Sequence, residues 1–406
     1  MTTEPDRQEP TPAGAGWLVQ LTGPDRPGIT ADLMTTLDLL DAEVQDVEQV
    51  LVRGMLTLAV AVSEPSDHDA LRSTLQHLAS QYDLRLDLSP IPASSGRRPH
   101  VDAVTVLGHG FETPLSAAEL AAVAGGVVAA GGNVDRVVRL ARYPVYAYEF
   151  RVSGADPLAL RTHLGQAAAA HRLDVALQPA GLERRAKRLV VLDVDSTLIQ
   201  DEVIELLASE AGCLDEVRAV TDRAMAGELD FEAALRERVR RLAGLDVAAL
   251  ERARGRVRLT PGARTFVRTL KRLGYCVGIV SGGFTHFTDP LAAELGLDHA
   301  VANELELRDG RLTGEVLGDV VDRARKAELL QQFAAAEGIP LSQTVAVGDG
   351  ANDLDMIAAA GLGVAFNARP VVQQAADTTV NVPYLDAVLF VLGVTRDEVE
   401  AADESC

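Results

Sequence analysis

The chain has few cysteines and no long apolar run. Its three cysteines, Cys213, Cys276 and Cys406, are too few and too widely spaced for a disulfide framework or a zinc signature. No stretch of about 18 apolar residues occurs, so no membrane span is expected. The opening residues, MTTEPDRQEPTPAGAG, lack the basic flank and apolar stretch of a signal peptide. These absences favour a reducing, cytoplasmic location.

Positive charge is also scarce. Lys and Arg number 38 against 59 Asp and Glu, which gives a formal net charge of −21. Nucleic acids are bound by basic surfaces, so this balance argues against a nucleic-acid partner. With 47% hydrophobic residues the chain can bury a core, and its 406 residues favour two or three domains.

The most informative stretch is Asp193-Val194-Asp195-Ser196-Thr197. It follows the apolar, β-branched run Arg188–Leu192, which predicts a buried parallel strand. Two carboxylates therefore lie where a strand ends, which is where open α/β sheets bind ligands. An aspartate there can attack phosphorus, and a neighbouring acid can protonate the leaving oxygen and then activate water. The alternative is an acidic turn without a catalytic role.

Two further predicted strands end in polar residues. One leads into Gly348-Asp349-Gly350-Ala351-Asn352-Asp353, the other into Ser281-Gly282-Gly283, and Lys326 lies between them in a helix-like stretch. Four segments in fixed order resemble the haloacid dehalogenase superfamily of phosphohydrolases, and within it most closely the phosphoserine phosphatase family. They are DVDSTLIQDEVIELLA from Asp193, AMAGELDFEAALRERV from Ala224, IVSGGF from Ile279 and VAVGDGANDLDM from Val345. The resemblance covers the chain from about Leu189 to Leu392.

The resemblance implies the chemistry of the aspartates. Asp193 is the expected nucleophile, and Asp195 the acid and base. The Asp193 side chain, the Asp195 backbone carbonyl and the Asp349 side chain would hold one Mg²⁺. Carboxylates within about 4 Å repel by a few kcal/mol at an effective dielectric near 20, and an all-oxygen ligand set suits magnesium. Asp353 would hold a metal-bound water or orient Lys326, or it would only cap the following helix.

The implied substrate is O-phospho-L-serine. Its phosphoryl group would contact Ser281, Gly282, Gly283, Lys326 and Asn352. Its ammonium would meet Glu202 and its carboxylate Arg238, whose planar guanidinium suits bidentate recognition. Met225 and Phe231 would close over the substrate, or belong only to the core of a cap. Asn352 could instead be a helix N-cap, and Lys326 a solvated lysine.

The first 180 residues contain a weak internal repeat with a period of about 85 residues. Each unit predicts the βαββαβ order of a ferredoxin-like fold. The turn Thr22–Gly28 resembles the ligand turn of ACT domains, which are small amino-acid sensors, and makes Gly23, Asp25 and Gly28 candidate effector contacts. The matching turn Gly108–Pro114, with Gly108 as the candidate, lacks the Asp-Arg pair. Sensing and pure dimerisation both stay open, and both predict a homo-oligomer, a dimer or larger.

The expected fold is α/β. A doubly wound parallel sheet of haloacid dehalogenase type with an inserted helical cap follows two ACT domains. The predicted segments are a disordered tail at 1–15, ACT domains at 16–92 and 100–180, a phosphatase core at 186–395 with its cap at about 203–258, and an acidic tail at 396–406. Asp309-Gly310 between alternating apolar residues predicts a hairpin within the core.

The expected function is hydrolysis of O-phospho-L-serine to L-serine and phosphate through an aspartyl phosphate, the last step of L-serine synthesis. L-serine or another amino acid would be the effector. One alternative is a phosphatase or phosphotransferase of the same superfamily. It would act on phosphothreonine or phosphohomoserine, which differ from phosphoserine by one carbon and are discriminated by only ~1–3 kcal/mol in an apolar pocket. The other is a non-catalytic amino-acid sensor.

Overall fold

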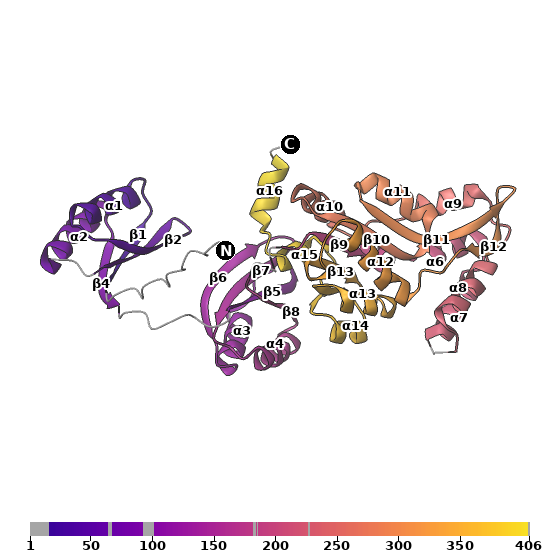
Figure 1. The fold of residues 1–406 in the computed structure, drawn as a ribbon, viewed down its shortest axis with the longest axis horizontal. Coiled ribbons are helices and arrows are strands. Elements are labelled where there is room, and N and C mark those ends of the chain that lie inside the picture. The colour runs from indigo at the N-terminus through magenta and orange to yellow at the C-terminus, as the bar shows by residue number, and fades with distance from the viewer. Residues whose placement is uncertain are drawn as a thin grey trace, which may run out of the picture. The chain divides into compact units, whose positions relative to one another are not determined.

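The structure is a computed structural model that describes residues 16–63, 67–91, 101–181, 184, 186–225 and 228–404. The predicted tail at 1–15 lies outside these residues. The chain divides into two compact units, Met1–Arg97 and Arg98–Cys406, whose elements are labelled in Figure 1. No helix within the described ranges is both long enough and apolar enough to cross a membrane.

The first unit is a four-stranded antiparallel sheet in the order β2-β3-β1-β4, with two helices. Strand β3 shows why it forms: Leu56, Leu58, Val60 and Val62 alternate along it and are fully buried, as one face of a half-buried strand requires. The elements are β1 (Gly16–Pro24), α1 (Ile29–Leu39), β2 (Val44–Val52), β3 (Met55–Ser63), α2 (His68–Tyr82) and β4 (Arg85–Ile91).

The second βαββαβ domain repeats this order and opens the second unit. Its sheet runs β6-β7-β5-β8, and Ser116 and Glu119 form a capping box at the start of α3. Strand β5 continues to Phe111, so the first half of the predicted turn Gly108–Pro114 is strand. The elements are β5 (Val101–Phe111), α3 (Ala117–Ala129), β6 (Asn133–Ala141), β7 (Val145–Ser153), α4 (Pro157–His171) and β8 (Leu173–Pro179).

A seven-stranded sheet in the order β12-β11-β10-β9-β13-β14-β15 forms the core of the rest of this unit. Strand β11 pairs antiparallel with β12, whereas the other neighbours are parallel. The strands are β9 (Leu189–Leu192), β10 (Cys276–Phe284), β11 (His299–Arg308), β12 (Arg311–Leu317), β13 (Thr344–Gly348), β14 (Gly363–Phe366) and β15 (Thr378–Val380). Asp309 and Gly310, both at positive φ, make the predicted β11–β12 hairpin turn.

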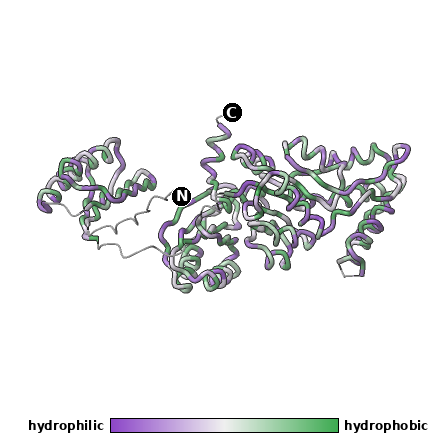
Figure 2. Tube along the Cα trace, in the orientation of Figure 1, coloured by the Kyte–Doolittle hydropathy of each residue, from purple (hydrophilic) through white to green (hydrophobic). Residues whose placement is uncertain are grey.

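Helices cover both faces of this sheet (Figure 1). Val190 and Leu192 of β9 pack in one apolar cluster with α10 and α11, and Leu189 and Val191 pack in another with α12, α13 and α14. Figure 2 shows the resulting hydrophobic central strands. The helices are α10 (Ala263–Arg272), α11 (Thr285–Leu295), α12 (Arg323–Ala336), α13 (Leu354–Ala359), α14 (Pro370–Ala375) and α15 (Val388–Val391). This architecture confirms the predicted α/β class.

A helical insertion follows β9. It consists of α6 (Val203–Ala211), α7 (Leu214–Met225), α8 (Phe231–Arg240) and α9 (Val247–Arg254). Its two connections to the core run side by side, because Ile199 and Leu259 form an antiparallel bridge. The insertion is also tied to the β11–β12 hairpin, where Arg311 Nη1 donates to the Gly244 carbonyl at 2.6 Å.

Two segments of the second unit pack against its core: the C-terminal segment and the second βαββαβ domain. The segment assigned to a tail at 396–406 forms the helix α16 (Arg396–Glu404) over most of its length, with Arg396 buried and paired to Asp386 at 2.6 Å. The acidic composition of this segment predicts a tail, and Figure 2 shows its many hydrophilic residues. The second βαββαβ domain also docks on the core, because Gln178 of β8 donates to the Val391 carbonyl at 2.9 Å. The buried Arg184, paired with Glu149 at 2.6 Å, donates to the same carbonyl at 3.3 Å.

Candidate active site

The functional side chains meet where three neighbouring strands end. Strand β9 lies between β10 and β13, so Asp193, Ser281 and Asp349 come to one edge of the sheet. A pocket of about 560 Å³ opens there beneath the helical insertion. Its lining includes most of the predicted site residues: Asp193, Asp195, Glu202, Phe231, Arg238, Gly282, Gly283, Asp349 and Asn352.

A tight turn carries the two leading aspartates. After β9 the chain enters the turn η1 (Val194–Leu198), in which Ser196 adopts a left-handed conformation with φ of 58°. The turn is held by Val194 N–H, which donates to Asp193 Oδ1 at 2.8 Å. Thr197 is fully buried and donates through Oγ1 to Asp349 Oδ1 at 3.1 Å. The turn therefore links the end of β9 to the end of β13.

Lys326, near the start of α12, is fully buried between two carboxylates. Its Nζ lies 2.7 Å from Asp193 Oδ1 and 2.7 Å from Asp353 Oδ1. Burial lowers the pKa of Lys326, but the charges of Asp193 and Asp353 outweigh burial, so the pKa is raised and the ammonium stays charged. The alternative of a solvated lysine is therefore wrong.

Asp353 orients this lysine. Its Oδ2 accepts from Gly350 N–H at 3.0 Å while its Oδ1 accepts from Lys326. The bond to Gly350 N–H is also the capping-box bond of the short helix η3 (Ala351–Asp353), so this carboxylate both orients Lys326 and caps η3, whereas it makes no side-chain cap on α13.

The Asp195 carboxylate contacts a different part of the site, formed by Val203 and Ser281. Its Oδ1 accepts from Val203 N–H at 2.7 Å, and its Oδ2 accepts from Ser281 Oγ at 3.1 Å. Burial raises the pKa of Asp195 to about 7, and the negative charge of Glu202 adds to the rise. A carboxyl group that titrates near neutrality can both give and take a proton.

The carboxylates form a charged cluster that calls for a cation. Oxygen atoms of Asp193, Asp349 and Asp353 all lie within 4.8 Å of one another. Burial raises the pKa of Asp193 well above its ordinary value and that of Asp349 to about 7, and in both cases the charge of Asp353 adds to the rise. An all-oxygen set of this kind fits Mg²⁺, which would offset the repulsion.

Gly282 and Gly283 line the pocket, and Ser281 before them is fully buried. Gly283 N–H donates to Ser281 Oγ at 2.8 Å. A side chain at Gly283 would clash, because its Cβ would lie 2.9 Å from Asp195 Oδ2 and 2.8 Å from Val203 Cγ2. Only glycine allows this close approach of backbone and carboxylate.

The insertion supplies Glu202, Arg238 and Phe231. Ser196 Oγ donates to Glu202 Oε1 at 2.9 Å, which fixes this carboxylate beside the aspartates. Arg238 is half-buried and lines the pocket; burial lowers its pKa, although the charges of Glu202 and Asp195 oppose that change. Phe231 lies over Gly282, whose added Cβ would come 3.0 Å from the ring.

Two other predicted residues, Met225 and Asn352, and the neighbouring Arg236 remain to be placed. Met225 ends α7, and its side chain lies outside the described residues. Asn352 lies in the short helix η3 (Ala351–Asp353) and is not an N-cap, since Gly350 and Asp353 hold the N-cap positions of η3 and α13. Arg236 pairs with Glu232 at 2.7 Å and does not line the pocket.

The effector candidates lie in the N-terminal domains. Gly28 caps α1 with φ of 98°, Gly23 lies near the end of β1, and Asp25 N–H donates to the Gly54 carbonyl at 2.9 Å. Gly108 lies within β5, so it belongs to a strand and not to a turn.

Sequence reasoning missed three contributors. Thr197 holds Asp349, as described above. Asn303 is buried and holds the Gly282 carbonyl, to which its Nδ2 donates at 2.8 Å. Arg369 lines the pocket, and its N–H donates to the Asp349 carbonyl at 3.3 Å. Thr197 lies within the quoted motif and could have been found; Asn303 and Arg369 lie in segments without a motif.

Comparison with known proteins places these features in a family. Residues 190–358 match the model of haloacid dehalogenase-like hydrolases, and residues 17–89 and 100–178 each match an ACT-domain model. A phosphoserine phosphatase of Streptomyces coelicolor is 58% identical over 95% of this chain and 94% of its own length. Phosphoserine phosphatase SerB2 of Mycobacterium tuberculosis is 48% identical over 97% of this chain and 96% of its own. The unliganded crystal structure of a probable phosphoserine phosphatase from Vibrio cholerae superposes with a TM-score of 0.57 at 36% identity, over 75% of this chain and 89% of that one.

Proposed function

The chain belongs to the phosphoserine phosphatase family of haloacid dehalogenase-like hydrolases with ACT domains, and on that basis we propose that it hydrolyses O-phospho-L-serine to L-serine and phosphate. The observation that carries the proposal is the placement of two aspartates just after β9: Asp193 Oδ1 lies 2.7 Å from Lys326 Nζ, and Asp195 Oδ2 accepts from Ser281 Oγ at 3.1 Å. Such a pair can divide the work of a nucleophile and a proton donor.

In the first step Asp193 attacks phosphorus. Its Oδ1 is held by Lys326 and Val194 N–H, and its Oδ2 accepts no hydrogen bond from the described residues, which leaves that oxygen for the new bond. As the bond from Oδ2 to phosphorus forms, the bond from phosphorus to the seryl oxygen breaks. Asp195 gives its proton to that oxygen, and L-serine leaves.

In the second step water releases phosphate. Asp195, now ionised, takes a proton from a water molecule, whose oxygen attacks phosphorus. The bond between phosphorus and Asp193 breaks, which restores both carboxyl groups to their starting state. The same residue can serve as acid and then as base because burial raises its pKa to about 7.

The phosphoryl oxygens need positive partners throughout. Lys326 is fixed by Asp353 and supplies a permanent charge beside Asp193. The Gly282 backbone amide and Asn352, which both line the pocket, would supply neutral donors. The Ser281 hydroxyl and Gly283 N–H would do so on leaving their present partners, Asp195 Oδ2 and Ser281 Oγ.

Magnesium belongs to the proposal. The Asp193 side chain, the Asp195 carbonyl and the Asp349 side chain would hold it, and Asp353 is left to orient Lys326. When bound, the ion supplies positive charge to the phosphoryl group and keeps Asp193 ionised.

Substrate choice is assigned to the insertion. Glu202 would bind the ammonium group and Arg238 the carboxylate, because both line the pocket. Phe231 would cover the substrate, since its ring lies against Gly282. The insertion would open to release serine.

Regulation, assembly and location complete the proposal. The ACT domains would bind L-serine or another amino acid and join the chain into a homo-oligomer, most simply a dimer. A cytoplasmic location is supported by the free thiols of Cys213 and Cys276, the two cysteines that the structure describes.

Phosphate release from a substrate panel tests the function. The purified protein is assayed with L-phosphoserine, phosphothreonine and p-nitrophenyl phosphate, with magnesium and with chelator. We expect a strong preference for L-phosphoserine that the chelator abolishes. Broad activity would discard the substrate and keep the hydrolase; activity unaffected by chelator would discard the metal.

A further inference from the structure

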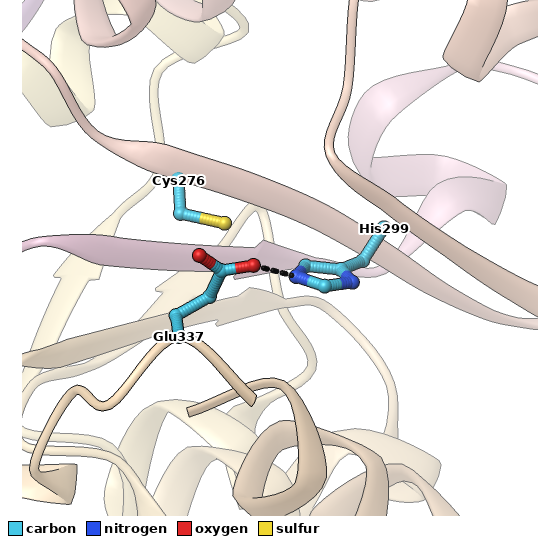
Figure 3. Close-up of side chains that lie close together, drawn as sticks. All are labelled: Cys276, His299 and Glu337. Atoms are coloured by element: carbon cyan, nitrogen blue, oxygen red, sulfur yellow. Dashed lines mark hydrogen bonds and ion pairs between the residues drawn. The ribbon is translucent and has the colours of Figure 1, made fainter. Parts of the chain in front are cut away.

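A second cluster of metal-ligand side chains lies at the other end of the catalytic sheet. Cys276 is the first residue of β10, His299 is the first residue of β11, and Glu337 directly follows α12 (Figure 3). One ligand atom from each lies within 4.8 Å of the others. The catalytic aspartates follow the opposite, carboxyl ends of these parallel strands, so the proposed reaction makes no use of this cluster.

The cluster is held in place by packing. His299 Nε2 lies 2.9 Å from Glu337 Oε1, and the imidazole stacks on Phe333 with ring centroids 4.4 Å apart and planes 11° apart. Gly278 makes room for this stack, because a Cβ there would lie 3.1 Å from His299 Cβ and 3.2 Å from the Phe333 ring. The ring plane of His299 is therefore set beside Cys276 by α12 and β10 together.

We propose that Cys276, His299 and Glu337 form a site for Zn²⁺ or a similar borderline-soft divalent cation, with water as the fourth ligand. Thiolate, imidazole and carboxylate are the three ligand types of protein zinc sites, and three protein ligands plus water is a common set. The oxygen-only cluster at the aspartates favours Mg²⁺ instead, so donor chemistry separates the two sites.

The separation between His299 and Glu337 suits a tetrahedral ion with little rearrangement of these two ligands. Zinc bonds of 2.0–2.1 Å to nitrogen and oxygen place those two ligand atoms about 3.3 Å apart. The present separation of 2.9 Å between His299 and Glu337 would open by about 0.4 Å. The charges also balance, because one thiolate and one carboxylate neutralise a dication.

Binding exchanges a proton for the metal. The bond between sulfur and hydrogen of Cys276 breaks, the thiolate donates its electron pair to the metal, and the proton passes to solvent. His299 binds as the neutral imidazole, and Glu337 as the carboxylate.

A redox role for Cys276 fits the structure less well. Burial raises the pKa of the thiol to about 12, aided by the charges of Asp298 and Glu337, whereas reactive thiols have lowered pKa values. Cys213, the other described cysteine, belongs to the helical insertion. Asp298 accepts from Lys271 Nζ at 2.6 Å and Val277 N–H at 2.7 Å, and it also forms a hydrogen bond with the Cys276 thiol that metal binding would replace.

Cobalt(II) absorption of the full chain tests the site independently of activity. Cobalt bound through a thiolate gives a charge-transfer band in the near ultraviolet, whereas cobalt among the catalytic aspartates has only oxygen ligands. The titration is made with excess magnesium on the wild type and on Asp193→Asn, Cys213→Ser, Cys276→Ser and Glu337→Gln. We expect one equivalent of band-forming cobalt, displaced by Zn²⁺, in the wild type, Asp193→Asn and Cys213→Ser.

The same titration separates the outcomes. Cys276→Ser should abolish the band, and Glu337→Gln, whose side chain is exposed, should weaken cobalt binding by more than the about 10–100-fold that losing an outer-shell partner costs. Zn²⁺ should also slow alkylation of Cys276 and leave that of Cys213 unchanged, a measurement that needs no variant. No band in the wild type, an equal band in Cys276→Ser, or equal alkylation with and without zinc would each overturn the proposal.

Discussion

Replacing Asp349 by asparagine should stabilise the metal-free protein at neutral and alkaline pH. Burial, with the charges of Asp353 and Glu202, raises the pKa of Asp349 from 3.8 to about 7. Since one pKa unit is about 1.4 kcal/mol, ionising this group costs the folded state about 4 kcal/mol relative to the unfolded chain. Asparagine removes the charge and keeps an oxygen that can accept from Thr197 Oγ1.

The sign follows from proton binding. Between about pH 4 and pH 7 the folded state holds a proton on Asp349 that the unfolded state has lost, so wild-type stability falls as pH rises through this range. The Asp349→Asn variant escapes that loss. Its advantage should be about 2 kcal/mol at pH 5.5 and about 4 kcal/mol at pH 8, and small near pH 4.

Denaturant unfolding of the full chain with chelator, followed by circular dichroism at pH 5.5 and pH 8, measures this difference. Asp355→Asn is the matched control, because Asp355 is an exposed aspartate of α13, and it should change stability by under about 0.5 kcal/mol. Magnesium should stabilise the wild type and not Asp349→Asn. A variant less stable than the wild type at pH 8, or an advantage that does not grow with pH, would refute the electrostatic reasoning.

Three other changes test separate parts of the molecule. Asp193→Asn should abolish phosphate release with an unchanged circular dichroism spectrum, and substantial residual turnover would remove its role as nucleophile. Arg238→Ala should lower kcat/KM for phosphoserine by about 10- to 150-fold, which is the worth of a charged hydrogen bond, and should change kcat/KM for p-nitrophenyl phosphate little. Arg236→Ala is the control and should change neither value. Equal losses on both substrates would contradict carboxylate recognition. Asp174→Ala should destabilise the protein in urea unfolding by about 1–3 kcal/mol, because Asn381 N–H, 2.6 Å away, loses its acceptor. The loss of unfolding free energy in Asp174→Ala should be larger at pH 6 than at pH 8. The hydrogen bond to Asp174 raises the pKa of His109, and this pair stabilises the fold only while the imidazole is protonated. A loss that does not depend on pH would contradict the pairing of His109 with Asp174.

The sequence predicted the fold well because its signals are local. Alternation in β3, the Asp309-Gly310 turn and the apolar runs before Asp193 and Asp349 each depend on neighbours in the chain, and the predicted fold class is confirmed. Local signals alone gave an incomplete picture of the C-terminal segment. The highly charged run from Arg396 reads as a tail, but Asp403 pairs with Arg268 and Arg272 of α10, far away in sequence.

In the candidate site too, residues within sequence motifs could be predicted, whereas residues whose role depends on tertiary packing could not. Motif residues such as Asp193, Asp195 and Asp349 were found from sequence, and the structure gathers them in one pocket. The complete burial of Lys326 depends on how α12 packs against the sheet, which no spacing of residues reveals. Asn303 was missed for the same reason, since its partner Gly282 lies on the neighbouring strand.

The docking of the second ACT domain has a consequence for solubility. Strand β15 ends the seven-stranded sheet, and an uncovered edge strand is a template for pairing with other molecules. Here β8 lies beside β15, and Asp174 of β8 accepts hydrogen bonds from the Asn381 backbone and side chain. The second ACT domain thus covers this edge of the catalytic sheet. A core cut free at residue 186 would expose this edge, so a chain shortened to its catalytic half should self-associate.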